Sequence, residues 1–535
     1  MLGATPREFE SRILRTTPGG RAPVTWSERG RQTITSSSAP RDSGLRLRRP
    51  RPEVTASSRP PYAALAALGG SIALVTFVAA LGPSAVEPPL PGAGGLPPYA
   101  AALHPPAGLV VALLAAAVGL GTAGLLGAER AVRRGWAPAS RRLLAAGALA
   151  VAVLALTPPI GTADPQSYAA YGRLAATGRD PYASTPAELA ATGDPVGRAV
   201  EPPWQRTPSV YGPVATAEQA LLSRVGGSSV RTTVVLLAGV NAVAFLGTGL
   251  LLDRLAARYG DPARRRAALL WTLNPLLLYQ LVAGAHLDAL VVVAVAGALL
   301  ALRRSALLAG LAAGAAAAIK APAALVGAGL AWALLPARRR LLALMAGGLL
   351  VVLPAYAAAG PHAPAQLGRA SRLISAATPW RLPAHFLDPA LGAETSRRLI
   401  GALALLLAAA LAVLLARGLP RRDDDEISAA IRAALILTLA YLLAAPYALP
   451  WYDATAWALL ALLPASAYDR LLLARTATLS LAYLVGRVVP LSDPVRILTS
   501  VLRGGVAPAV LAALVIATFI ASRPRPMPAR AEAGR

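Results

Sequence analysis

The sequence predicts an all-α integral-membrane protein, a polytopic bundle of about fourteen transmembrane helices. Hydrophobic residues make up 55% of the chain and charged residues only 15%. Apolar runs of roughly 18 or more residues recur, and each is long enough to cross a bilayer as a helix. The arginines gather in short stretches between these runs, which is the positive-inside pattern of membrane proteins.

Both ends of the chain are expected to lie in the cytoplasm. Residues 1–60 carry twelve arginines with many Ser, Thr and Pro but no apolar core, so they predict a disordered tail and not a signal peptide. The tail either binds anionic lipid headgroups or serves as an orientation signal. Residues 61–523 form the predicted membrane domain, and 524–535 a second cytoplasmic tail.

The first three predicted spans cover 62–82, 106–127 and 143–160. The basic loop "ERAVRRGWAPASRR" after the second span is assigned to the cytoplasm, so the third span exits on the outer side. There begins the polar stretch 161–231, the longest between spans, which we expect to be a large outer loop.

Eleven further spans complete the prediction. Two short spans flank Lys320, and one follows the outer segment 359–396. The spans around Lys320 and the span near 452–466 could instead be re-entrant segments that enter and leave the membrane on the same side. The others lie near 233–252, 267–283, 287–302, 341–358, 429–446, 452–466, 476–490 and 505–522. We find no internal repeat, which disfavours a transporter built from two halves.

The composition also excludes several function classes. The formal charge of +26 resides in short loops between spans, so no nucleic-acid partner is expected. There is no cysteine, hence no disulfide or Cys-based metal site. The sequence contains neither GxxxxGK[ST] nor HExxH, which removes the commonest nucleotide-binding and metalloprotease signatures.

Asp164 and Lys320 are the two most informative charges. Asp164 follows the third span at the outer membrane boundary, where a carboxylate can act as a general base or cap the helix predicted after it. Lys320 is the only lysine among 52 basic residues and interrupts an apolar run at the outer end of a short span. It either snorkels to the interface or pairs with a phosphate.

Other candidates share the predicted outer side. His286 and Asp288 lie in a turn between two spans, as a structural pair or as ligands for substrate hydroxyls; two such residues are too few for a metal site. Aromatic side chains could stack on a sugar or belong to the interfacial belt. The further candidate substrate contacts are Tyr168, Arg173, Trp204, Tyr211, Trp451 and Tyr452.

Five stretches, taken in order, resemble one family. They are "DPQSYAAYGRLAATGRDPY", "YGP", "NPLLLYQLVAGAHLDAL", "KAPAALV" and "LPWYDATAW". They look like the actinobacterial polyprenyl-phosphate-mannose-dependent α-(1→6)-mannosyltransferases, over roughly residues 60–520. The family's His–Asn–Asp turn appears here as "HLD", with Leu287 in place of the polar residue.

The resemblance implies a GT-C class enzyme in the plasma membrane with its active site on the outer face. It implies a polyprenyl-phosphate-mannose donor and a mannan or lipoglycan acceptor. Asp164 matches the family's catalytic base, and "KAPA" matches a Lys–Pro turn. No cofactor is required by the sequence, and a divalent metal stays possible. The alternatives are a GT-C enzyme for another polyprenyl-phosphate sugar, a secondary transporter or lipid flippase, and a non-catalytic scaffold.

Overall fold

A computed structural model describes residues 60–92, 96–422 and 425–522, which all belong to one compact unit. The predicted cytoplasmic tails lie outside these residues, apart from Pro60. The described chain is helical and contains no strand. The predicted all-α class is therefore confirmed for this part of the sequence.

The first half of the described chain runs from the first span to the turn before Lys320. Its elements are α1 (Tyr62–Leu81), α2 (Ala107–Arg133), α3 (Ser140–Leu154), α4 (Asp164–Ala176), α5 (Pro186–Ala191), α6 (Pro195–Arg198), η1 (Trp204–Arg206), α7 (Pro213–Gly226), α8 (Val230–Ala257), α9 (Asp261–Ala267), η2 (Ala268–Thr272), α10 (Pro275–Leu277), η3 (Leu278–Ala283), α11 (Asp288–Leu302) and α12 (Ala306–Ile319).

The second half begins directly after Lys320. Its elements are η4 (Ala321–Ala323), α13 (Ala324–Ala333), α14 (Arg338–Ala359), α15 (His362–Ala370), α16 (Arg381–Leu391), α17 (Ala393–Gly418), α18 (Glu426–Ala444), η5 (Pro450–Asp453), α19 (Ala454–Ala461), α20 (Ala467–Ala482), α21 (Asp493–Val501), η6 (Leu502–Val506) and α22 (Ala507–Ala521).

Seven helices in the described part of the chain are long and apolar enough to cross a membrane. They are α1, α2, α8, α14, α17, α18 and the run from α21 to α22. The other apolar helices are shorter than the roughly 20 residues that a 30 Å hydrocarbon layer needs. The protein is thus a helical membrane protein with seven candidate spans, and the remaining seven predicted spans correspond to shorter or broken helices.

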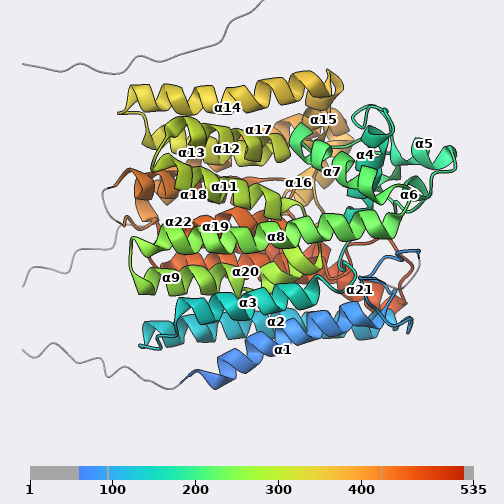
Figure 1. Cartoon of the computed structure of the whole chain (residues 1–535), viewed down its shortest axis with the longest axis horizontal. Coiled ribbons are helices and arrows are strands. Elements are labelled where there is room, and N and C mark those ends of the chain that lie inside the picture. The colour runs from blue at the N-terminus through green and yellow to red at the C-terminus, as the bar shows by residue number, and fades with distance from the viewer. Residues whose placement is uncertain (1–59, 93–95, 423–424, 523–535) are drawn as a thin grey trace, which may run out of the picture. The chain divides into compact units, whose positions relative to one another are not determined.

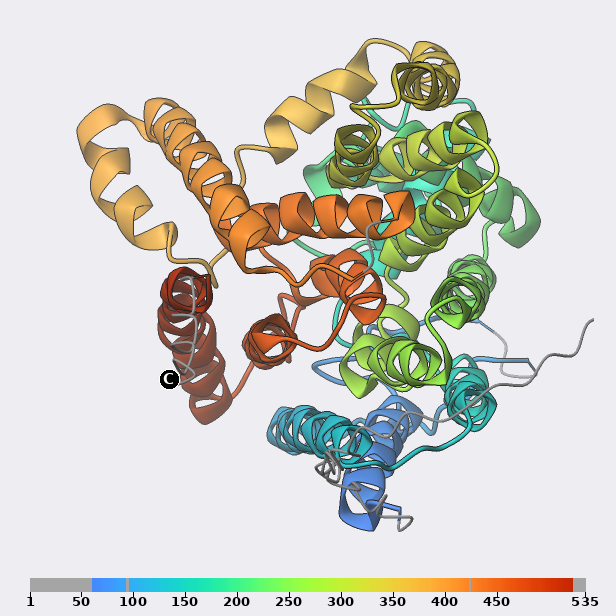
Figure 2. The same cartoon turned by 90° about the vertical axis from the view of Figure 1, so that its left-hand side faces the viewer.

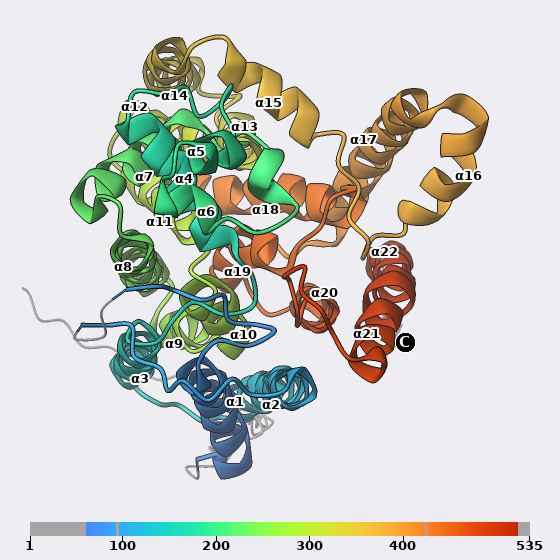
Figure 3. The same ribbon diagram turned by 90° about the vertical axis from the view of Figure 1, so that its right-hand side faces the viewer.

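The long helices lie side by side, and α4 to α7 gather with α15 near one end (Figure 1). Seen along most of the helix axes, α18 and α19 lie centrally, with α1 and α2 on one flank and α14 on another (Figures 2 and 3). The hairpin of α16 and α17 lies with α21 and α22 on a third flank. The hydrophobic core runs through the centre, where almost every residue of α19 is buried.

The predicted outer segment 161–231 is folded into helices α4 to α7. The close packing of α4 on α7 depends on Gly172, since a Cβ there would overlap the backbone of Gln219. Arg487 joins this segment to two others by pairing with Glu201 and donating to the Glu87 carbonyl oxygen at 2.9 Å. The segment is therefore fixed onto the helix ends.

The predicted span 267–283 is a broken helix. The α9–η2 run ends at Thr272, and Asn274 caps the restart at Pro275 by accepting the Leu276 amide at 3.1 Å. The amide group of Asn274 also donates to Leu270 O at 3.1 Å. Backbone groups freed by a break inside a membrane protein need such internal partners.

Two late helices differ from the predicted ranges. α20 begins at Ala467, nine residues before the predicted span 476–490, because Ser466 and Asp469 form a capping box. Its interior holds Arg475, a charge that hydropathy assigns to a loop. The region near 452–466 forms only the short helices η5 and α19.

Loops predicted to share a side do meet in space. At the end predicted to be cytoplasmic, Arg266 pairs with Asp469 at 2.7 Å, and Arg340 pairs with Glu426 at 2.7 Å. At the opposite end Gln366 Nε2 of α15 donates to the Tyr182 carbonyl oxygen at 2.7 Å. The predicted alternation of helix ends is thus consistent with the contacts.

Candidate active site

Four segments far apart in the sequence meet at the end of the bundle where α4 to α7 lie. They are the start of α4, the turn before α11, the break between α12 and η4, and the turn η5. Each carries a residue that the sequence singled out: Asp164, His286, Lys320 and Tyr452.

Asp164 is the first residue of α4, and its carboxylate does not cap the helix. The capping alternative is therefore wrong: the Asp164 amide instead donates to Thr162 Oγ1 at 3.2 Å. Tyr168, one turn later, lies beside the carboxylate. Burial raises the pKa of the Asp164 carboxyl to about 6, although the Lys320 ammonium acts to lower it.

The backbone before Asp164 is held on three sides. The Ile160 amide donates to Ala283 O at 2.8 Å, and the Gly161 amide donates to Val86 O at 2.7 Å. The Gly486 amide donates to Gly161 O at 2.8 Å. Gly161 has φ +97°, a conformation that favours glycine. These contacts fix the position from which the carboxylate projects.

His286 faces Asp164 with the nitrogen that lacks a hydrogen. Its Nδ1 lies 2.5 Å from Gln280 O, so Nδ1 carries the proton and donates to this carbonyl. Nε2 then accepts from Thr162 Oγ1 at 3.2 Å and lies 3.7 Å from Asp164 Oδ2. Burial lowers the pKa of the His286 imidazole to about 3, which keeps the ring neutral at physiological pH.

Lys320 has a partner that the sequence did not reveal. Its Nζ donates to both carboxylate oxygens of Asp288 at 2.8 Å. The predicted pairing of His286 with Asp288 is absent; each pairs with a residue distant in the sequence. The counter-charge that Lys320 needs at this depth is thus supplied by the protein itself.

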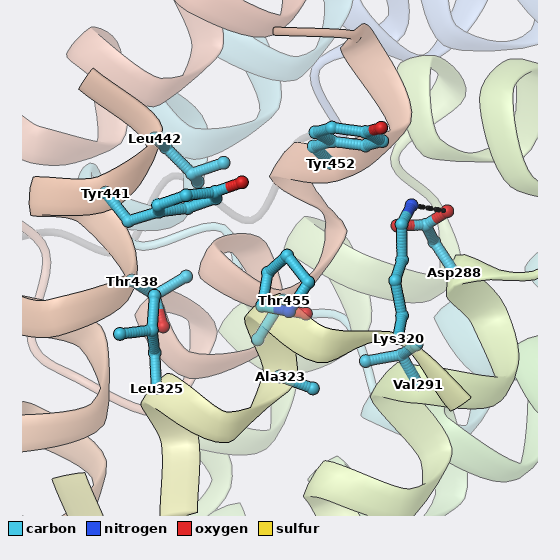
Figure 4. A pocket seen from close by; sticks show the side chains of 11 residues that line it. Asp288, Val291, Lys320, Ala323, Leu325, Thr438, Tyr441, Leu442, Tyr452 and Thr455 are labelled. Atoms are coloured by element: carbon cyan, nitrogen blue, oxygen red, sulfur yellow. Dashed lines mark hydrogen bonds and ion pairs between the residues drawn. The ribbon is translucent and has the colours of Figure 1, made fainter. Parts of the chain in front are cut away.

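Lys320 and Asp288 form one wall of a small cavity (Figure 4). Tyr452 lies over the pair, with Nζ 3.9 Å from the ring centroid, as a cation–π contact. Tyr441 and Leu442 of α18 line the opposite wall. The cavity therefore combines one ion pair with aromatic and aliphatic surfaces.

Aromatic rings surround the carboxylate and the imidazole. Trp451 stacks on His286 with ring centroids 3.6 Å apart and planes 13° apart. Tyr211 meets Tyr168 edge to face at 5.1 Å. The turn that carries Tyr211 approaches α12 closely because Gly212 has no side chain, and the Gly212 amide donates to Ile319 O at 2.9 Å.

Two predicted substrate contacts lie apart from this cluster. Arg173 Nε donates to Asp194 Oδ2 at 2.8 Å, and Asp194 also caps α6, so the pair stabilises the outer segment. Trp204, in η1, packs half-buried against the hydrophobic core. The described residues contain no group of three or more His, Cys, Asp or Glu that could hold a metal ion.

The sequence analysis did not identify Thr162, Gln280 or the ion pair between Asp453 and Arg475 as parts of the site. Asp453 belongs with the site because it directly follows Tyr452 in the chain. Thr162 and Gln280 act through a hydroxyl and a backbone carbonyl, for which the sequence carries no signal. Asp453 did carry one, since it is a charge inside the predicted span 452–466, whereas Arg475 fell in the loop predicted before the next span.

The site combines a neutral imidazole and a desolvated carboxylate with an ammonium group and aromatic rings. Such a site can remove a proton and bind an anion.

A family profile described as alpha-(1->6)-mannopyranosyltransferase, N-terminal domain, matches residues 66–338, just over half of the chain. The chain belongs to this family. All the charged site residues except Asp453 and Arg475 fall within the matched range.

Individual relatives match over a shorter range. Alpha-(1->6)-mannopyranosyltransferase B of Corynebacterium glutamicum is 34% identical over 136 residues, 25% of this chain and 22% of that protein. An alpha-(1->6)-mannopyranosyltransferase of Mycobacterium tuberculosis is 33% identical over 142 residues, 26% of this chain and 23% of that protein. The match thus spans less than a quarter of the length of these curated relatives. No solved structure matches the chain.

Proposed function

We propose that this protein is an α-(1→6)-mannosyltransferase of the GT-C class. It transfers mannose from a polyprenyl-phosphate-mannose donor to a mannan or lipoglycan acceptor on the outer face of the plasma membrane. We further propose about fourteen membrane passes, some made by the short helices, with both termini in the cytoplasm. Membership of the family and the acid–base site support this proposal.

The observation that carries the proposal is the Asp164 carboxylate facing the unprotonated nitrogen of His286. Asp164 takes the proton from the acceptor 6-hydroxyl as its oxygen attacks the mannosyl anomeric carbon. The new C–O bond forms as the bond to the donor phosphate breaks, and polyprenyl phosphate leaves with the bonding electrons. The single displacement inverts the anomeric centre.

His286 accommodates the proton that Asp164 has gained. A protonated carboxyl becomes a hydrogen-bond donor, and Nε2 of His286, 3.7 Å away, can accept from it after a small side-chain movement in which the Thr162 hydroxyl turns away from Nε2. The neutral imidazole therefore favours the state after proton transfer. This role requires no charge on His286.

Lys320 interacts with the leaving phosphate in this mechanism. As the glycosidic bond breaks, the phosphate gains negative charge, so a fixed ammonium stabilises the transition state more than the intact donor. Lys320 must then share its three hydrogens between Asp288 and the phosphate. A small movement of the ammonium away from one Asp288 oxygen suffices.

The test uses the full-length protein in liposomes with radiolabelled polyprenyl-phosphate sugars and a synthetic mannoside acceptor. Wild type should transfer mannose, and Asp164→Asn should lose about 100-fold or more of turnover because the amide cannot accept the proton. Asp194→Asn, in the same outer segment, is the matched control and should stay active. Transfer of arabinose in place of mannose, or an active Asp164→Asn variant, would contradict the proposal.

A further inference from the structure

A buried ion pair lies behind the candidate site. Asp453 ends the turn η5 and Arg475 lies inside α20, and the side chains are 0% and 1% exposed. Thr476 Oγ1 donates to Asp453 Oδ2 at 2.7 Å. Arg475 Nη2 donates to Leu442 O at 2.9 Å. The pair therefore joins η5 to both α20 and the end of α18.

Stability alone does not account for this pair. Charges inside a membrane domain are costly, and a buried ion pair is often no more stabilising than apolar residues of the same volume. A buried pair of this kind can instead fix one arrangement of the elements that it joins.

The turn that Asp453 anchors carries two rings of the site. Trp451 stacks on the imidazole of His286, and Tyr452 lies against the ammonium of Lys320. Both residues immediately precede Asp453 in one 3-10 turn. A displacement of the Asp453 carboxylate would therefore move both rings, and with them the groups that they hold.

We infer that Asp453 and Arg475 are positioning residues of the active site: their ion pair sets the place of η5, so that Trp451 orients His286 and Tyr452 orients Lys320. This inference rests on the proposed function for its consequence in catalysis. The geometric part concerns the stacking of Trp451 on His286 and stands independently of any activity.

The main variant is Asp453→Leu with Arg475→Met, which removes both charges and leaves no unpaired partner. Its Tm should stay within a few degrees of wild type, because apolar replacement of a buried pair is often neutral. Its turnover should fall about 100-fold, the loss expected from a displacement of about 1 Å in an active site. If this variant does not fold, Asp453→Asn with Arg475→Gln takes its place.

The matched control is Asp253→Leu with Arg264→Met. This Asp–Arg pair joins α8 to α9 at the opposite end of the bundle, and its side chains are 13% and 35% exposed. It should keep turnover within about threefold of wild type. An equal loss of turnover in the control would attribute the effect to general loosening and overturn the inference.

A second readout does not depend on activity. The chain has only four histidines, so ¹³C-histidine labelling can resolve the His286 ring proton signals. Stacking on Trp451 should shift His286 Hε1 upfield in wild type and in the control, and the shift should vanish in Trp451→Leu and in the main variant. An unchanged shift in the main variant would overturn the inference, whereas an inactive wild type would contradict only the proposed function.

Discussion

At the scale of single residues, the environment of Asp164 sets the pH dependence of the proposed reaction. A base must be deprotonated to act, and burial raises the pKa of this carboxyl to about 6. We therefore expect kcat/KM to rise tenfold per pH unit below about 6 and to level off above it, because this ratio reports the free enzyme. An ordinary aspartate would place the rise near pH 4.

The measurement is kcat/KM for mannosyl transfer between pH 4.5 and 8. The donor phosphodiester keeps a constant charge over this range, so it adds no step of its own. The residual activity of Asp164→Asn should lack the rise, since that variant has no carboxyl at this position. A flat profile in wild type between pH 5 and 7 would remove Asp164 from the role of base.

The pairing of Lys320 with Asp288 changes how its role can be tested. Lys320→Met alone would leave a buried carboxylate without its counter-charge, at a cost of about 3–5 kcal/mol. Lys320→Met with Asp288→Asn removes both charges, so we expect a Tm near wild type. Turnover should still fall by about 100-fold, the usual effect of losing one group that stabilises developing charge.

Steady-state kinetics and thermal unfolding of the double variant check this expectation. The KM for the acceptor should be nearly unchanged, since the ammonium is assigned to the donor phosphate. Asp288→Asn alone serves as the control for the second substitution. Ordinary turnover in the double variant would return Lys320 and Asp288 to a purely structural ion pair.

At the scale of elements, the close approach of the 211–213 turn to α12 determines where Tyr211 lies in the site. A Cβ at Gly212 would overlap the carbonyl of Ala318. Gly212→Ala should therefore push Tyr211 away from the site, with a loss of about 1–3 kcal/mol of stability and of most activity. Gly239→Ala in α8, where a Cβ meets no neighbour, is the control and should be neutral or stabilising.

Chemical denaturation and transfer assays on both glycine variants measure the two effects. Gly212→Ala with wild-type activity would mean that the turn tolerates displacement, and Tyr211 would then have no role at the site. Both variants add the same methyl group, but only the one at Gly212 meets a neighbouring backbone.

Hydropathy predicted the helical class and the end of the bundle at which Asp164, His286 and Lys320 would lie. It could not predict which helices become neighbours, so the pairs Lys320–Asp288 and Asp453–Arg475 remained hidden at separations of 32 and 22 residues. The start of α20 was missed for a related reason. The buried partner Asp453 makes the charge of Arg475 tolerable inside a helix. Hydropathy alone treats such a charge as evidence against a membrane helix.

At the scale of the whole molecule, the orientation in the membrane follows from the short loops. Several arginines flank the turn between α2 and α3, whereas the arginines of the outer segment belong to a stretch of about 70 residues. The positive-inside rule counts short loops and gives little weight to long ones. The turn between α2 and α3 is therefore expected in the cytoplasm, and residues 161–231 and 359–396 outside.

Single cysteines test this orientation on a background that has none of its own. Ser371→Cys and Ala139→Cys both place a thiol at an exposed position, Ser371 after α15 and Ala139 before α3. In intact cells an impermeant maleimide should label position 371, and it should label position 139 only after permeabilisation. Labelling of position 139 alone in intact cells would show that the protein has the opposite orientation. Asp164 would then lie in the cytoplasm, and the proposed site on the outer face would be wrong.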